Sequence, residues 1–390
     1  MAKAGSNRKY DNLMVLLPNV AALRAGDLVL TRNRHGTKAA GRTMSKVILK
    51  TTGGNFDHVM ICTVPPTLLE AVTAGVGNLS LARAFAHDLT GVRVLRYHDA
   101  RVAAAAASAA LTYVGRPYAH AGAATSIFPV GVFGEISGNN IFCSALVAQV
   151  FQKAGAPEFA ATSVEKTTPA TIERMASLTD VTAEVFVAGL APRNVEEMAA
   201  LDGDRTPSPI DKQVALFATY FLLLESKAQA IVSRHPQSSL AAPQSFLSCL
   251  QFLMSAYDAA ANAPPAVQAT LLFELTAFDD AVLVLINKGD WEALQAEASL
   301  QDAATTKRDL EESLKPKPDI DRRALAGLKD ATAKQLEGRS GAVAGIQDWG
   351  VGRSKTIDRY LAIAEETLNS LRHRALAIAE IEKRLEGSQS

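Results

Sequence analysis

The chain of 390 residues has few cysteines and no excess of charge of either sign. Its three cysteines, Cys62, Cys143 and Cys249, form no CxxC pair, which argues against a disulfide scaffold and a cysteine-rich zinc site. Forty basic residues balance forty acidic ones, so the cationic excess typical of nucleic-acid-binding proteins is missing. We therefore expect a reducing compartment and no nucleic-acid partner.

Long hydrophobic runs are also missing. The longest, Val214 to Leu224, covers about eleven residues, whereas roughly twenty are needed to cross a bilayer. The run Leu13 to Leu17 ends at Pro18 and is too short for the apolar region of a secretory leader. The sequence therefore predicts a protein that is cytoplasmic where it is made, and it leaves export by a leaderless route open.

Several catalytic and binding motifs are absent from the sequence. There is no G-x-S-x-G elbow of a serine hydrolase, no HExxH or local cluster of His and carboxylate metal ligands, and no phosphate-binding loop. The segment Ser163-Val-Glu-Lys166 spells S-x-x-K but lacks the companion motifs of that family. We expect no cofactor and no metal site.

The 48% of hydrophobic residues is enough for two folded parts, and the first part mixes helical and strand patterns. These patterns predict an α+β fold with a small antiparallel sheet. Helices are predicted near Tyr10–Leu23, Thr43–Lys50, Ala100–Val114 and Cys143–Gly155, and strands over Leu28–Thr31, His58–Thr63, Leu68–Val72, Val92–Tyr97 and Glu184–Val187.

Beyond about residue 200 the strand pattern disappears. The segment Asp202–Pro209 has the composition of a linker, and prolines divide the stretch after it into several helices. We predict a helical extension at 1–24, a catalytic domain at 25–200, a linker at 201–210 and a helical bundle at 211–390. The last helix carries a stripe with the spacing of a bundle core, formed by Ile357, Leu361, Ala364, Leu368, Leu371, Ala375 and Ile378.

Cys143 is the candidate nucleophile. It follows the turn-like segment Ser137-Gly-Asn-Asn140 and begins a predicted helix, where unpaired N–H groups favour a thiolate and can hold a developing oxyanion. The alternative is a small buried thiol. That alternative is preferred for Cys62, which lies in a β-branched run, and for Cys249, which lies in an apolar helix.

His58 is the candidate general base, because it begins a predicted strand after the glycine turn Thr52–Asp57. A catalytic imidazole needs a group that orients it, and Glu70 lies on the next predicted strand. On antiparallel neighbours the two side chains can share a face. The rival base is His120, and the histidines expected in loops or at strand ends are His35, His87 and His98.

Six segments between about residues 25 and 190 follow a known order. They are Gly26-Asp-Leu-Val-Leu, Phe56-Asp-His58-Val-Met-Ile, Leu69-Glu70-Ala-Val, Tyr113-Val-Gly-Arg-Pro-Tyr118, Phe142-Cys143-Ser-Ala-Leu-Val and Thr167-Thr-Pro-Ala-Thr171. This order resembles the circularly permuted papain-like hydrolases, the YiiX-like and lecithin:retinol acyltransferase-like branch of the NlpC superfamily. In that family a histidine precedes a polar partner on the next strand, and the cysteine comes last at a helix start.

The resemblance implies that Cys143 is the nucleophile, His58 the general base and then acid, and Glu70 the orienting group, with Tyr118 lining the substrate pocket. It implies cleavage of an amide, ester or thioester bond in a cell-envelope peptide or lipid, through a thioester on Cys143. The helical domain would hold the enzyme on a substrate, a membrane surface or a partner protein. The alternative class is a non-catalytic interaction protein, in which the papain-like part is a scaffold and the helical domain binds the partner.

Overall fold

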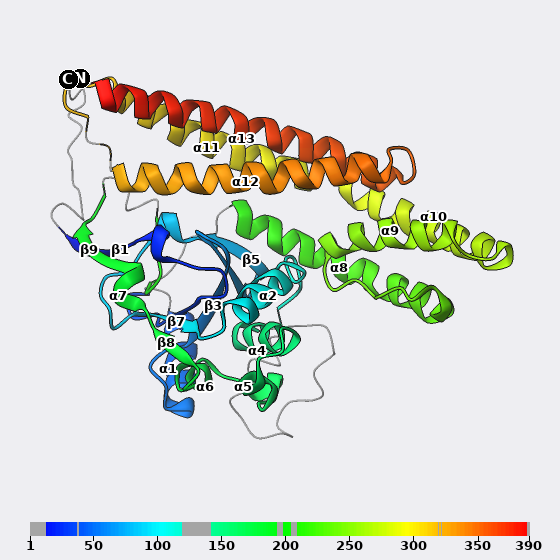
Figure 1. Ribbon diagram of the computed structural model, residues 1–390, viewed down its shortest axis with the longest axis horizontal. Helices are drawn as coiled ribbons and strands as arrows, with labels where there is room; N and C mark the ends of the chain where they lie inside the picture. The colour runs from blue at the N-terminus through cyan, green and yellow to red at the C-terminus, as the bar shows by residue number, and fades with distance from the viewer. Residues whose placement is uncertain are drawn as a thin grey trace.

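The computed structural model describes residues 13–36, 39–118, 142–192, 198–203, 209–318, 320 and 322–387. An α+β part comes first in the chain, and a group of long helices follows it (Figure 1). The predicted α+β class is therefore confirmed.

The centre of the first part is a six-stranded sheet with the strand order β5-β4-β3-β2-β7-β8, in which neighbouring strands are antiparallel. Four of its strands lie where the β-branched runs predicted them. Strands β5 and β8 were not predicted, because β5 has glycine at 75 and 77 and β8 is only three residues long. The strands are β2 (Leu28–Thr31), β3 (His58–Val64), β4 (Thr67–Val72), β5 (Gly75–Ser80), β7 (Val92–Tyr97) and β8 (Leu178–Asp180).

Helices cover one face of this sheet. Small side chains on α2, such as Ala103 and Ala106, pack with the sheet residues Leu28, Leu30 and Val59 in a single buried cluster. The same cluster contains most of α4, so the two helices and the sheet share one core. The helices of this part are α1 (Ala39–Thr52), α2 (Ala100–Leu111), α4 (Cys143–Lys153), α5 (Pro157–Ala160), α6 (Pro169–Glu173) and α7 (Thr182–Val185), with short 3-10 helices at Val20–Ala22, Leu81–Arg83 and Val164–Lys166.

Two short ladders flank the central sheet. Strand β1 (Met14–Pro18) pairs antiparallel with β9 (Phe186–Leu190), and β6 (Ala84–Phe85) pairs in parallel with β10 (Ala199–Ala200). The helix expected near Tyr10–Leu23, and with it the helical extension at 1–24, is therefore wrong over 14–18. A short apolar run fits a strand as well as a helix, and here the partner strand, far along the chain, decides between them.

The second part consists of six long helices. They are α8 (Pro209–Arg234), α9 (Phe246–Ala261), α10 (Pro265–Ile286), α11 (Asp290–Ser313), α12 (Arg322–Trp349) and α13 (Lys355–Gly387). One buried cluster draws residues from all six. Along α13 the predicted stripe is buried from Ile357 to Ile378, except for the half-buried Ala375, so the predicted bundle core is confirmed for this helix.

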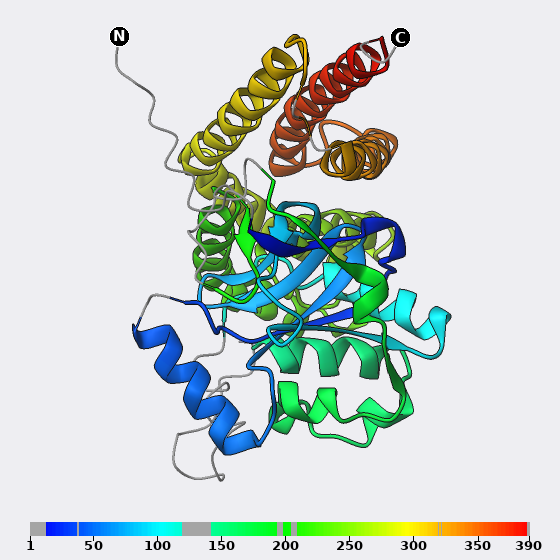
Figure 2. The same ribbon diagram turned by 90° about the vertical axis from the view of Figure 1, so that its left-hand side faces the viewer.

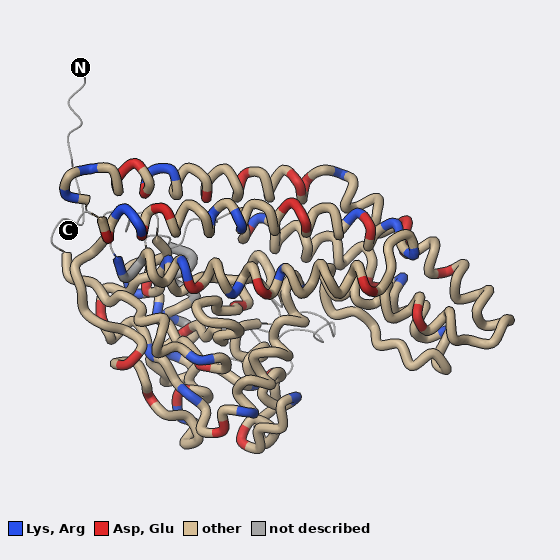
Figure 3. The backbone as a smooth tube through the Cα atoms, turned by 45° about the horizontal axis from the view of Figure 1, so that its top comes forward, with Lys and Arg blue, Asp and Glu red and all other residues tan. Residues whose placement is uncertain are grey.

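The helices α11, α12 and α13 lie beside the sheet, whereas α9 and α10 extend away from it (Figures 1 and 2). Acidic and basic residues are interspersed along these helices in the view of Figure 3. Such interspersed charge is typical of helix faces that contact water.

Helix α8 packs on the edge strand β5. Gly75 and Gly77 leave room for Val214, because a Cβ atom on Gly77 would lie 2.8 Å from Val214 Cγ2. A second contact joins the segment after α2 to the bundle, where Arg116 Nη1 donates to Gln244 Oε1 at 3.1 Å. The bundle thus covers the face of β5 at its two glycines.

Helix α8 is also the one described helix that is long and apolar enough to cross a membrane. The uninterrupted apolar run inside it is short, but the helix has 26 residues. Its apolar residues Phe217, Phe221 and Leu224 are buried in the bundle core. Because core helices pass the same test of length and composition, α8 does not mark a clear membrane protein.

Candidate active site

Cys143 is the first residue of α4, as predicted from the sequence. The N-cap residue is Phe142, whose side chain has no acceptor for the first-turn N–H groups. The positive end of the helix dipole therefore lies at Cys143, where it favours negative charge on the sulfur atom. Cys143 is 9% exposed, so the sulfur is largely shielded from water.

The position of α4 is held by side-chain hydrogen bonds to a later segment of the chain. Ser144 Oγ, directly after the cysteine, donates to the carbonyl oxygen of Thr167 at 2.6 Å. At the other end of the helix, Gln152 Nε2 donates to the carbonyl oxygens of Phe159 at 2.7 Å and Thr162 at 2.9 Å. These bonds tie both ends of α4, and with it Cys143, to the segment at 159–167.

His58 and Glu70 lie on the neighbouring antiparallel strands β3 and β4, and His58 Nε2 is 2.9 Å from Glu70 Oε2. The ladder pairs Ile61 with Leu69. Continued to the start of β3, this register sets Val72 opposite His58, which makes Glu70 the diagonal neighbour on the same face. The carboxylate is 6% exposed and the imidazole 22%, so the contact is shielded on the carboxylate side.

The imidazole of His58 also interacts with Cys143. Burial lowers the pKa of His58, but the charge of Cys143, a hydrogen bond with its side chain, and the contact with Glu70 together raise this pKa to about 10. Because Nε2 faces Glu70, Nδ1 is the ring nitrogen left for the sulfur atom. The structure thus brings together the three residues that the sequence proposed for catalysis.

Tyr118 lies near the same sulfur atom. Burial and the charge of Cys143 both raise the pKa of the Tyr118 hydroxyl. The ring packs against the buried cluster that contains Cys143. This position is compatible with the pocket-lining role that the resemblance implies. The rival base, His120, lies outside the described residues.

Asp57 is a second carboxyl group beside the imidazole, and the sequence reasoning assigned it no role. Burial raises the pKa of Asp57, and the neighbouring charge of His58 partly offsets this increase. Ser45 Oγ donates to Asp57 Oδ2, and the backbone N–H of Asn33 donates to Oδ1 at 3.3 Å. Asp57 therefore anchors the turn that precedes His58. The only sequence feature that could have pointed to Asp57 is that it directly precedes His58 in the chain.

The other two cysteines are buried away from any imidazole partner among the described residues. Burial raises the pKa of Cys62, and it raises the pKa of Cys249 to about 12. Both thiols therefore stay protonated at neutral pH, as expected for small apolar core residues.

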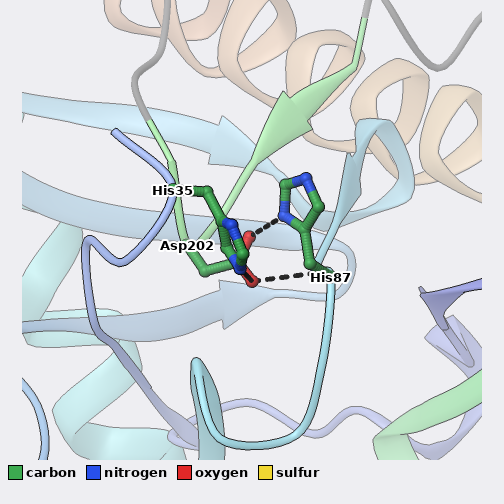
Figure 4. Close-up of side chains that lie close together, drawn as sticks. All are labelled: His35, His87 and Asp202. Carbon is green, nitrogen blue, oxygen red and sulfur yellow. Dashed lines mark hydrogen bonds and ion pairs between the residues drawn. The ribbon is translucent and has the colours of Figure 1, made fainter. Parts of the chain in front are cut away.

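A separate group of side chains lies where three loops meet, and it was missed by the search for local metal-ligand motifs. It consists of His35, His87 and Asp202 (Figure 4). Asp202 and His87 are 115 residues apart, so no local motif could have shown it. Asp202 is buried, so the linker predicted at 201–210 does not begin as an exposed segment.

One large cavity does not include Cys143 among its lining residues. It measures about 1840 Å³ and lies between α11, α13 and the β5–β6 region, with Asn78, Asp302 and Arg374 among its lining residues. Side-chain chemistry, and not cavity size, therefore identifies the candidate active site.

In comparisons with known proteins, no protein-family model, curated protein or solved structure matched this chain.

The geometry defines what the site can do chemically. A sulfur atom at a helix N-terminus, an imidazole that contacts it and a carboxylate on the other ring nitrogen supply a nucleophile, a proton carrier and an orienting group. The backbone N–H groups of the first turn of α4 are placed to stabilise negative charge on an oxygen atom close to the sulfur.

Proposed function

We propose that this protein is a cysteine-dependent hydrolase or acyltransferase of the circularly permuted papain-like type. The observation that supports it most is the position of His58, between Glu70, at 2.9 Å, and the Cys143 side chain at the start of α4. The order of histidine, carboxylate and cysteine along the chain is the order of that family. A structural cysteine would not require an imidazole that is itself held by a buried carboxylate.

In the proposed reaction, the Cys143 thiolate attacks the carbonyl carbon of an amide, ester or thioester. The oxyanion that forms is stabilised by N–H groups at the start of α4. The C–N, C–O or C–S bond then breaks, His58 gives its proton to the leaving group, and a thioester remains on Cys143. His58 next takes a proton from water or another acceptor, which attacks the thioester and releases the thiolate. Glu70 holds the ring and stabilises its charged form, and Tyr118 lines the pocket.

The proposed substrate class is a peptide or lipid of the cell envelope. We propose that the bundle, α8 to α13, places the catalytic part on a substrate, a membrane face or a partner protein. The proposal includes synthesis in the cytoplasm and no role for nucleic acid. It treats the two parts as a catalytic domain at 25–200 and a helical domain at 211–390.

The test is to incubate the purified chain with peptidoglycan fragments and, separately, with phospholipids, and to identify the products by mass. Cys143→Ala should abolish product formation while circular dichroism shows an unchanged fold. Cys249→Ala is the matched control, because this cysteine is buried in the bundle. Full activity of the Cys143→Ala variant would contradict the proposal. Retention of a binding function by that variant, without turnover by either protein, would favour the scaffold alternative.

A further inference from the structure

Three side chains from distant segments converge on one point next to the β6–β7 loop. His35 follows β2, His87 follows β6, and Asp202 follows β10 (Figure 4). One ligand atom of each residue, an imidazole nitrogen or a carboxylate oxygen, lies within 4.8 Å of the others. The group shares no residue with the candidate active site.

The carboxylate of Asp202 lies close to both imidazoles. His87 Nδ1 is 2.7 Å from Asp202 Oδ1, and His35 Nε2 is 3.8 Å from Asp202 Oδ2. The two rings lie side by side, with centroids 4.1 Å apart. Ligands of a tetrahedral zinc ion lie about 3.3 Å from one another, given metal–ligand distances near 2.0–2.1 Å. The 2.7 Å separation from His87 Nδ1 to Oδ1 is shorter than this value, and the 3.8 Å separation from His35 Nε2 to Oδ2 is longer. Both imidazoles therefore move slightly relative to the carboxylate when an ion binds.

Backbone contacts hold the carboxylate and its surroundings in place. The backbone N–H of His87 donates to Asp202 Oδ2 at 2.8 Å, and that of His35 donates to the carbonyl oxygen of Asp202 at 2.7 Å. Gly91 leaves the space that Asp202 fills, since a Cβ atom there would lie 2.7 Å from the Cβ atom of Asp202. Such support of a ligating carboxylate by hydrogen bonds is usual around protein metal sites.

The exposure of the three residues differs in a way that suits metal entry. The Asp202 side chain is 0% exposed, that of His87 25% and that of His35 42%. A metal ion therefore has access from the His35 side, where that imidazole can turn to close the coordination shell. The same open side leaves room for a fourth ligand, such as water.

We propose that His35, His87 and Asp202 form a binding site for a divalent first-row transition metal, and that Zn²⁺ is the ion it binds best. His87 Nδ1, His35 Nε2 and one oxygen of Asp202 bind the ion, and His87 Nδ1 loses its hydrogen bond to the carboxylate when it does so. Two nitrogen donors exclude Ca²⁺ and Mg²⁺, which prefer oxygen. The ion ties Asp202, after β10, to the loops that carry His35 and His87, and thereby stabilises this part of the sheet domain.

The test is a Zn²⁺ titration against a chromophoric chelator, in the Cys143→Ala background so that the thiol cannot bind the metal. The parent should bind one ion. His35→Ala should weaken this binding by more than the roughly 10- to 100-fold typical for loss of an outer-shell partner. The matched control is His98→Ala, which removes another exposed histidine of the same domain. The melting temperature should rise with Zn²⁺ in the parent and control but not in His35→Ala.

Because His35 is exposed, its removal is expected to leave the metal-free fold intact, as circular dichroism will show. Asp202→Asn is a second variant, which keeps the size of the side chain and removes its charge. Equal Zn²⁺ affinity of the His35→Ala and His98→Ala variants would overturn the proposal. So would the lack of saturable binding in the parent, because a purely hydrogen-bonded cluster takes up no metal.

Discussion

Glu70 Oε2 contacts the ring nitrogen of His58 that is directed away from Cys143. The carboxylate is thus placed to orient the ring and to stabilise its positive charge. Both effects can be separated by substitution, because glutamine keeps the shape of the side chain and loses the charge.

We expect Glu70→Gln to lower the pKa of His58 by about one unit or more, because a charge-assisted hydrogen bond to the ring is lost. The measurement is an NMR titration of the His58 ring in the wild type and in the variant. Glu173→Gln is the control, because that glutamate bonds Arg93 at 2.9 Å and lies outside the site. Equal titrations of the two variants would show that Glu70 does not stabilise the charged ring.

Removal of the sulfur atom should lower the pKa of His58 well below about 10. Burial already lowers this pKa, and Cys143→Ala eliminates both the charge and the hydrogen bond that raise it. The contact with Glu70 then acts alone against burial. The measurement is an NMR titration of the His58 ring in the wild type and in Cys143→Ala, with Cys62→Ala as the control. An unchanged titration would contradict the contact between the two side chains.

Selective labelling should distinguish Cys143 from the other two thiols. Burial raises the pKa of Cys62 and of Cys249, so at about pH 6–7 neither carries a useful fraction of thiolate. Cys143 lies beside an imidazole that stays protonated up to about pH 10, so we expect it to react much faster. Peptide mapping after brief iodoacetamide treatment measures all three rates at once. Equally slow labelling of all three would count against a reactive thiol.

The raised pKa of His58 also predicts how stability depends on pH. A histidine whose pKa rises on folding, here from about 6.5 to about 10, contributes stability that is complete below pH 6.5 and is lost as pH rises through 10. The difference in unfolding free energy between the wild type and His58→Gln should therefore shrink between about pH 6.5 and 10. Urea unfolding at several pH values measures it. A difference that does not change with pH would contradict this assignment.

A largely buried ion pair joins β7 to the residue before β2. Arg96 donates to both oxygens of Asp27, at 2.8 and 2.7 Å, and Asp27 is 1% exposed. Arg96→Met leaves this carboxylate without the arginine and should lower the unfolding free energy by about 3–5 kcal/mol. Arg101→Met is the control, because the Arg101 side chain is 94% exposed and its loss should change little. Similar urea midpoints for the two variants would refute the prediction.

Strand β1 shows where prediction from the local sequence pattern fails. Val15, Leu16 and Leu17 are apolar in any conformation, and the sequence reasoning placed them in a helix. They form a strand because β9, more than 160 residues later, supplies the backbone partners of β1. Strand β7, by contrast, was predicted at Val92–Tyr97 with its observed bounds, because its β-branched run is clearly delimited.

The sequence alone determined the α+β class, the helical second half, the start of α4 at Cys143 and the strands that carry His58 and Glu70. These features depend on residues close together in the chain: the spacing of apolar residues and the glycine and proline residues that end each element. Tertiary structure alone decided that Glu70 is the diagonal neighbour of His58, that Asp202 is buried, and that it meets His35 and His87. Such contacts join distant residues, and their distances depend on strand register and loop path, which no local pattern specifies.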